Sequence, residues 1–66
     1  MAENWTPRVK KYLSEHGCKF ERQGKGDHEI WSSPHNGGVK FMVDNKIKTR
    51  KWANITVKNA GLPKAF

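Results

Sequence analysis

The spacing of apolar residues changes twice along this 66-residue chain. Near the N-terminus, Val9, Tyr12 and Leu13 stand at i, i+3 and i+4, the spacing of one face of an α-helix. Between residues 18 and 43 the spacing falls to two, the period of a strand with one buried face. After Thr49 the helical spacing returns. The periodicity therefore predicts a helix, then strands, then a second helix.

Turn and capping residues place the boundaries of these elements. Thr6-Pro7 predicts the start of the first helix, with the threonine hydroxyl as N-cap, and Thr49 predicts the cap of the second. Glycine-rich segments separate three predicted strands, over 18–23, 28–32 and 39–43. Both helices need the same sheet face to bury their apolar stripes. We expect one α+β domain over residues 1–66, in α-β-β-β-α order, with two helices packed on one face of a three-stranded antiparallel sheet.

The aromatic residues are expected to be mainly structural. Four of them fall on inward positions of their elements: Tyr12, Phe20, Phe41 and Trp52. Ile30 and Trp31 are neighbours in one strand and must face opposite sides of the sheet. If Ile30 faces the helices, Trp31 is exposed and can stack on a base or receive a protein partner. A register shifted by one residue buries Trp31 instead.

The charge of the chain indicates an anionic partner. Thirteen Lys and Arg against six Asp and Glu give a net charge of +7. On so small a surface this favours nucleic acid, and a ribosome-associated or merely soluble basic protein is the alternative. The longest apolar run, residues 41–43, is far shorter than the roughly 20 residues of a membrane span. The single cysteine, Cys18, cannot form an internal disulfide, which fits a reducing compartment, and we expect a cytoplasmic location.

The stretch GKGDHEIW places a titratable side chain, His28, directly after a flexible turn. RNA can be cleaved through attack of its own 2′-hydroxyl on the adjacent phosphate, which needs proton transfer and cations and can dispense with a metal. Histidine suits the proton transfer because its ordinary pKa is about 6.5. Gly24 and Gly26 would let a ribose-phosphate approach, and Lys25 would add positive charge. The alternative is an exposed hairpin residue behind turn glycines.

A second group of cations precedes and enters the second helix. It comprises Lys46, Lys48, Arg50 and Lys51. Positive charge at a helix N-terminus opposes the macrodipole, so a bound phosphate would explain it better than stability does. Arg22, Lys25 and Lys40 could extend this RNA-binding surface along the sheet. A solvated cationic edge that only aids solubility is the alternative.

The remaining histidines and acidic residues suggest neither a metal nor another cofactor. His35 lies in a turn and His16 at the end of the first helix, where a partly cationic imidazole is favoured. Asp27 and Glu29 share a strand side that His28 does not. No tetrahedral ligand set with ordinary spacing emerges, so we expect no metal site.

Three segments of the chain resemble the HicA family of toxin–antitoxin modules: HGCKFERQ, GKGDHEIWSSP and KIKTRKWANITVKNAGLPKAF. The resemblance covers nearly the whole chain, although Asp27 stands where serine is common in the family. It implies a double-stranded-RNA-binding-like fold, cleavage of messenger RNA with His28 as the catalytic histidine, and inhibition by a HicB-like antitoxin. A non-catalytic RNA-binding module, or a protein that binds only an acidic partner, are the alternatives.

Overall fold

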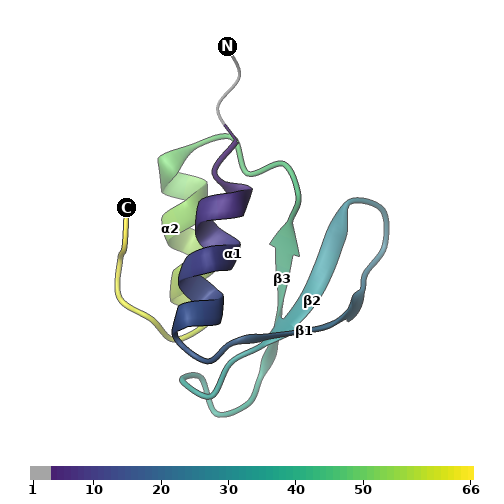
Figure 1. Ribbon diagram of the computed structural model, residues 1–66, viewed down its shortest axis with the longest axis vertical. Coiled ribbons are helices and arrows are strands. Elements are labelled where there is room, and N and C mark those ends of the chain that lie inside the picture. The colour runs from purple at the N-terminus through teal and green to yellow at the C-terminus, as the bar shows by residue number, and fades with distance from the viewer. Residues whose placement is uncertain (1–3) are drawn as a thin grey trace.

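The computed structural model describes residues 4–66 and contains two helices and one three-stranded sheet (Figure 1). The elements are α1 (Thr6–Glu15), β1 (Lys19–Gln23), β2 (His28–Ser32), β3 (Lys40–Asp44) and α2 (Arg50–Asn59). The strands are antiparallel in the order β1-β2-β3. This confirms the predicted α+β class and its element order. Within the described residues, no helix is both long and apolar enough to cross a membrane.

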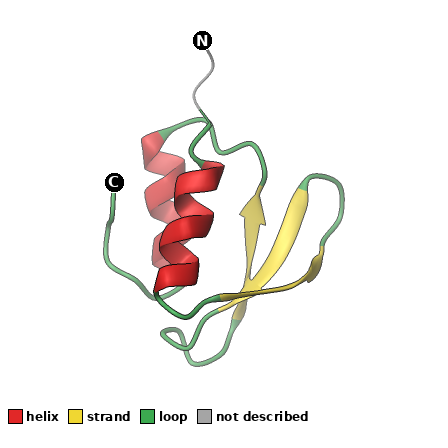
Figure 2. Ribbon diagram, in the orientation of Figure 1, coloured by secondary structure: helices red, strands yellow, loops and turns green. Residues whose placement is uncertain are grey.

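Both helices lie side by side on one face of the sheet, and the core fills the space between the two layers (Figure 2). The fully buried apolar side chains come from α1, β3, the loop after β3, and α2. The largest of them are Val9, Leu13, Val43, Ile47 and Val57. The apolar spacing predicted for α1 is confirmed, because Val9 and Leu13 both face this core.

The two predicted helix caps have different outcomes. Thr49 caps α2 as predicted, and its Oγ1 accepts a hydrogen bond of 3.1 Å from the backbone N–H of Trp52. The prediction for Thr6 was wrong, because Thr6 is already the first helical residue. Its hydroxyl donates to the carbonyl of Asp44 and accepts from the N–H of Ile47, each at 3.0 Å. Thr6 therefore ties α1 to the chain leaving β3.

The register of β2 buries Trp31. Trp31 is opposite Phe20 on β1 and Phe41 on β3, and only 6% of its surface is exposed. Ile30 is opposite Met42 on the other face of the sheet and is only half-buried. Of the two registers that the sequence left open, the observed one is the register that buries Trp31.

Two of the four aromatic residues expected to be buried are exposed. Phe20 is 51% exposed, because the β1–β2 hairpin stands clear of the helices (Figure 1). Its ring makes an edge contact with Trp31. Trp52 is 38% exposed, because the buried stripe of α2 runs through Ala53 and Val57 and leaves Trp52 on its flank. Phe41 is buried as predicted, and Tyr12 packs against the core.

Candidate functional site

His28 is the first residue of β2 and lies on the sheet face away from the helices. Glu29 and Trp31 occupy the helix-facing side of the same strand, so alternation turns His28 to the open side. Its side chain is 41% exposed. The imidazole is therefore mounted on a strand and remains open to solvent on the uncovered face of the sheet.

Asp44 faces His28 from the neighbouring strand. The two residues are cross-strand partners, and His28 Nδ1 lies 3.2 Å from Asp44 Oδ2. Nδ1 is shielded from solvent and has no hydrogen-bond partner among the described residues, so its close contact with the Asp44 carboxylate is not a hydrogen bond in this state. Catalytic contacts are often long or poorly aligned in the absence of substrate.

The carboxylate of Asp44 is held in place. Its Oδ1 accepts a hydrogen bond of 2.6 Å from the backbone N–H of Lys46, and the Asp44 side chain is only 15% exposed. The carbonyl of Asp44 accepts the bond from Thr6 described above. A fixed carboxylate beside Nδ1 favours the tautomer protonated at Nδ1 and stabilises the imidazolium. The pair can thus leave Nε2 available for proton transfer.

The turn before His28 is closed by its own backbone. The N–H of Gly24 donates to the carbonyl of His28 at 2.9 Å, and a Cβ at position 24 would lie only 3.0 Å from that oxygen. Gly26 has a φ of +65°, and a side chain there would meet nothing within 4 Å. Both glycines are thus explained by the turn, and Gly26 also leaves open space beside it. Lys25, between them, is exposed.

The loop after β3 docks onto this turn. The backbone N–H and side-chain Nδ2 of Asn45 both donate to the carbonyl of Asp27, at 3.0 and 2.8 Å. Lys46 Nζ lies 3.3 Å from Asp27 Oδ2. The fold therefore brings Lys46 beside the turn that carries His28, although the two positions are far apart in the sequence.

The predicted RNA-binding cations divide between two surfaces. Arg22 and Lys40 are cross-strand partners of Ile30 and Ser32, so they share the open sheet face with His28. Lys48 is exposed in the loop between β3 and α2. Arg50 and Lys51 line a hollow on the helix layer and belong to a second surface.

Glu29 directly follows His28 in the chain, yet it lies on the other side of the sheet. Lys10 Nζ on α1 donates to its Oε2 at 2.9 Å, and Trp31 Nε1 donates to its Oε1 at 3.0 Å. Burial by itself would raise the pKa of Glu29, but these hydrogen bonds and the charge of Lys10 outweigh it and lower that pKa. Glu29 is therefore a structural carboxylate.

The other two histidines are tied to the end of α1. Nδ1 of His16 lies 2.8 Å from the carbonyl of Tyr12, and Nε2 of His35 lies 2.6 Å from the carbonyl of His16. Across residues 4–66, no three His, Cys, Asp or Glu side chains gather as a metal site would require. Cys18 is buried.

Sequence reasoning missed Asp44. Its pairing with His28 depends on the register of β2 against β3, and the seven-residue connection between those strands gives no turn type that sets this register. The predicted third strand stopped at residue 43, and the available signal was a carboxylate at the next position, two residues before the cation Lys46.

The chain was also compared with known proteins. It matches no protein-family model, no curated protein and no solved structure. The functional conclusion therefore depends on the residues and contacts described above.

Proposed function

We propose that this protein is a metal-independent endoribonuclease that cleaves messenger RNA, with His28 as its general acid or base. The observation that carries the proposal is the position of His28, which is open to solvent on the uncovered sheet face and within 3.2 Å of the anchored Asp44 carboxylate. A buried histidine, or one paired only with backbone groups, could not meet an RNA strand in this way.

The reaction uses the nucleophile that RNA itself provides. Nε2 of His28 takes the proton of a ribose 2′-hydroxyl while O2′ forms a bond to the adjacent phosphorus. The bond from phosphorus to O5′ of the next nucleotide breaks, and the leaving oxygen receives a proton. The products are a 2′,3′-cyclic phosphate and a 5′-hydroxyl. Asp44 stabilises the imidazolium that forms during the first transfer.

The nearby cations have two tasks in this scheme. Lys25, on the adjoining turn, is the candidate donor of the second proton and adds positive charge near the phosphorane-like transition state. Arg22 and Lys40 on the open face, with Lys46 and Lys48 in the loop after β3, hold the flanking phosphates. Such contacts position RNA without reading much of its sequence.

The resemblance to the HicA family supplies the biological setting of the proposal. It suggests a toxin that acts in the cytoplasm, arrests growth by degrading messenger RNA and is neutralised by a HicB-like antitoxin. The stretch that carries His28, GKGDHEIWSSP, is the part of the resemblance that coincides with the site described above.

The test is cleavage of end-labelled single-stranded RNA by the purified protein in the presence of EDTA. We expect fragments ending in 2′,3′-cyclic phosphate, and a loss of roughly 10²–10⁴-fold in kcat for His28→Ala, the usual range for general acid–base catalysis. Circular dichroism and thermal unfolding should show that this variant folds.

Two results would overturn the proposal. The first is that the wild-type protein binds RNA but never cleaves it, and that His28→Ala binds RNA with the same affinity. This result would identify a non-catalytic RNA-binding module. The other is cleavage that survives His28→Ala.

A further inference from the structure

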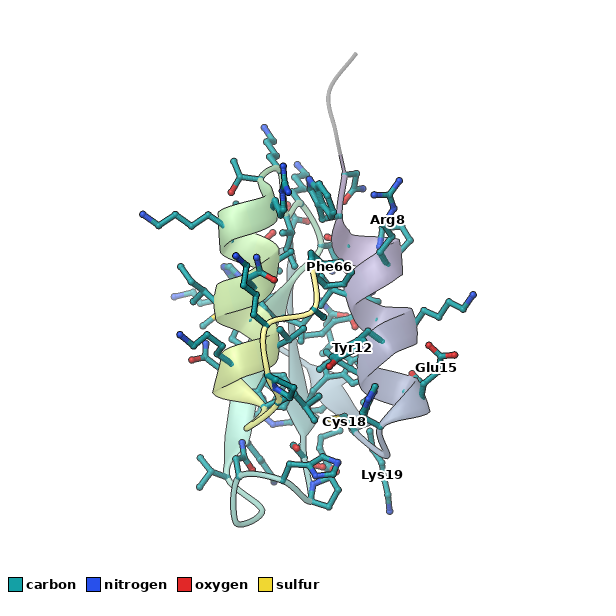
Figure 3. All side chains as sticks on the ribbon, turned by 90° about the vertical axis from the view of Figure 1, so that its left-hand side faces the viewer. Arg8, Tyr12, Glu15, Cys18, Lys19 and Phe66 are labelled. Carbon is teal, nitrogen blue, oxygen red and sulfur yellow. The ribbon has the colours of Figure 1, made fainter. Side chains whose placement is uncertain are left out.

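The helix layer carries a basic hollow on the molecule's other surface. Its volume is about 450 Å³, and it is lined by Arg50, Lys51, Asn54, Ile55, Lys58 and Lys64. Five of these residues belong to α2, and Lys64 belongs to the C-terminal segment that runs beside it in front of the sheet (Figure 3). We call this hollow the α2 groove.

Helical spacing builds the α2 groove. Arg50, Asn54 and Lys58 follow one another at intervals of four, as do Lys51 and Ile55, so all five lie along one stripe of α2. The stripe covers eight residue steps, or roughly 12 Å at 1.5 Å per residue. It is therefore an elongated surface, long enough to contact more than one phosphate of a strand.

The C-terminal segment is fixed against α2 and supplies the other wall. Asn54 and Phe66 exchange two hydrogen bonds, Nδ2 to the carbonyl oxygen at 3.0 Å and N–H to Oδ1 at 2.9 Å. The ring of Phe66 packs edge-on against Tyr12 (Figure 3). It makes a similar edge contact with Trp5. These contacts hold the segment that carries Lys64.

The charge of the α2 groove is uncompensated. Residues 45–66 contain six Lys or Arg and no Asp or Glu, so this third of the chain carries +6 of the net +7. Within residues 4–66, none of the four groove cations takes part in an ion pair. Packing so much like charge together favours binding of an anion.

Further cations connect the α2 groove to the open sheet face that carries His28. Lys46 lies beside the His28 turn, and Lys48 lies two residues later in the same loop. Arg50 is the first residue of α2. This loop crosses one end of the molecule, from the end of β3 to the start of α2 (Figure 1). A flexible polyanion can therefore contact cations continuously from the open sheet face to the helix layer.

We propose that the α2 groove is a second RNA-binding site, which holds backbone phosphates of the same strand that is cleaved at His28, with Lys58 and Lys64 as contacts. The inference rests on the proposed function, since it assumes an RNA substrate. A strand with one charge per nucleotide matches a run of separate cations that continues around the molecule. None of the described residues that line the groove is aromatic and could stack on a base, so its contacts are with phosphates.

The experiment compares two RNAs and two variants of equal net charge. The RNAs share a central sequence and are about 5 and about 20 nucleotides long, below and above the usual site sizes of single-strand-binding folds. The groove variant is the double substitution Lys58→Gln/Lys64→Gln. The control is Lys11→Glu, on the exposed surface of α1, which lowers the net charge by the same two units. Equilibrium affinity is measured in a His28→Ala background, and cleavage separately with His28 present.

The groove variant should bind the long RNA roughly 5- to 10-fold more weakly than Lys11→Glu does and leave the short RNA unaffected. Its salt slope on the long RNA should fall by about 1.4, two contacts at roughly 0.7 each. Equal effects on both RNAs, or equal effects of the two variants, would overturn the inference. So would groove-dependent binding of a polyglutamate peptide without groove-dependent RNA binding, because it would assign the groove to an acidic protein. Length-dependent binding without any cleavage would refute the ribonuclease and leave the groove intact.

Discussion

Trp31 Nε1 donates a hydrogen bond of 3.0 Å to Glu29 Oε1, two residues earlier on the same side of β2. Lys10 on α1 holds the other oxygen of that carboxylate and also donates to Asn45 Oδ1 at 2.7 Å. This cluster lies between the sheet and α1, so it fixes which side of β2 faces the helices. The exposure of His28 on the opposite side is a consequence of the same alternation.

Replacing Glu29 by Gln should make the protein less stable near neutral pH, and the difference should shrink in acid. The pKa of Glu29 is lowered in the folded state, so the unfolded chain binds more protons as the pH falls through the range between the two pKa values. The stability contributed by the carboxylate is therefore present above the ordinary glutamate pKa of about 4.3 and lost below it. Urea unfolding of both proteins at about pH 6.5 and about pH 3.5 measures this.

The control for Glu29 is Glu21→Gln. Glu21 is exposed on β1 and accepts one hydrogen bond from Ser32. Its substitution changes the net charge equally but should have a small effect on stability at both pH values. If Glu29→Gln behaves like Glu21→Gln, the contacts of Glu29 with Lys10 and Trp31 contribute no pH-dependent stability.

Truncating Trp31 to alanine should destabilise the protein by about 3–5 kcal/mol, the usual cost of removing a large buried aromatic side chain. For so small a domain this approaches its whole free energy of unfolding. Met42→Ala, on the open face of the same sheet and 52% exposed, should stay within about 0.5 kcal/mol of the wild type. Thermal unfolding of both variants measures these losses. A small loss for Trp31→Ala would contradict the observed register, since a sheet with Ile30 inside would tolerate that substitution.

The element order was predictable from the sequence, because periods of 3.6 and two are distinct and turn residues separate them. The side of β2 that faces the helices was not predictable from the sequence. Ile30 and Trp31 are both apolar, so alternation cannot choose between them. The choice depends on two features that periodicity does not reveal. One is the contact between Lys10 on α1 and Glu29 on β2, and the other is the shift in the β1–β2 pairing between Phe20 and Arg22.

The candidate site was predictable in part. His28 and its turn were apparent, because the stretch Gly-Lys-Gly-Asp-His places a side chain able to transfer protons directly after a flexible turn. The partner Asp44 lies 16 positions further along, and only the pairing of β2 with β3 brings it to His28. In the sequence, Lys58 and Lys64 are isolated lysines. Only the packing of the C-terminal segment beside α2 brings them to the same hollow.

Asp44→Asn should lower kcat by roughly 10- to 100-fold, as is common for residues that orient a catalytic group, with little change in KM. An amide retains an oxygen that can accept the Lys46 N–H, so the loop after β3 should keep its conformation. The neutral amide, unlike the carboxylate, neither favours protonation of His28 at Nδ1 nor stabilises the imidazolium. Nitrogen-15 NMR of the His28 ring should report a changed tautomer balance, which a purely structural role would not produce. Unchanged kcat and ring shifts would exclude Asp44 as a positioning residue.

Asp27→Ser should increase affinity for RNA. Asp27 and Lys46 are both largely exposed, so their ion pair contributes little to stability and the variant should fold normally. The carbonyl of Asp27 still accepts the bonds from Asn45, which keeps the loop docked. Removing the carboxylate frees Lys46 for a phosphate, and the salt dependence of binding should steepen by about 0.7, one added contact to single-stranded RNA. Glu15→Ser, on the exposed end of α1, changes the net charge equally and serves as the control. An equal gain in both variants would mean that total charge alone governs binding, and that Lys46 has no particular part in holding the strand near His28.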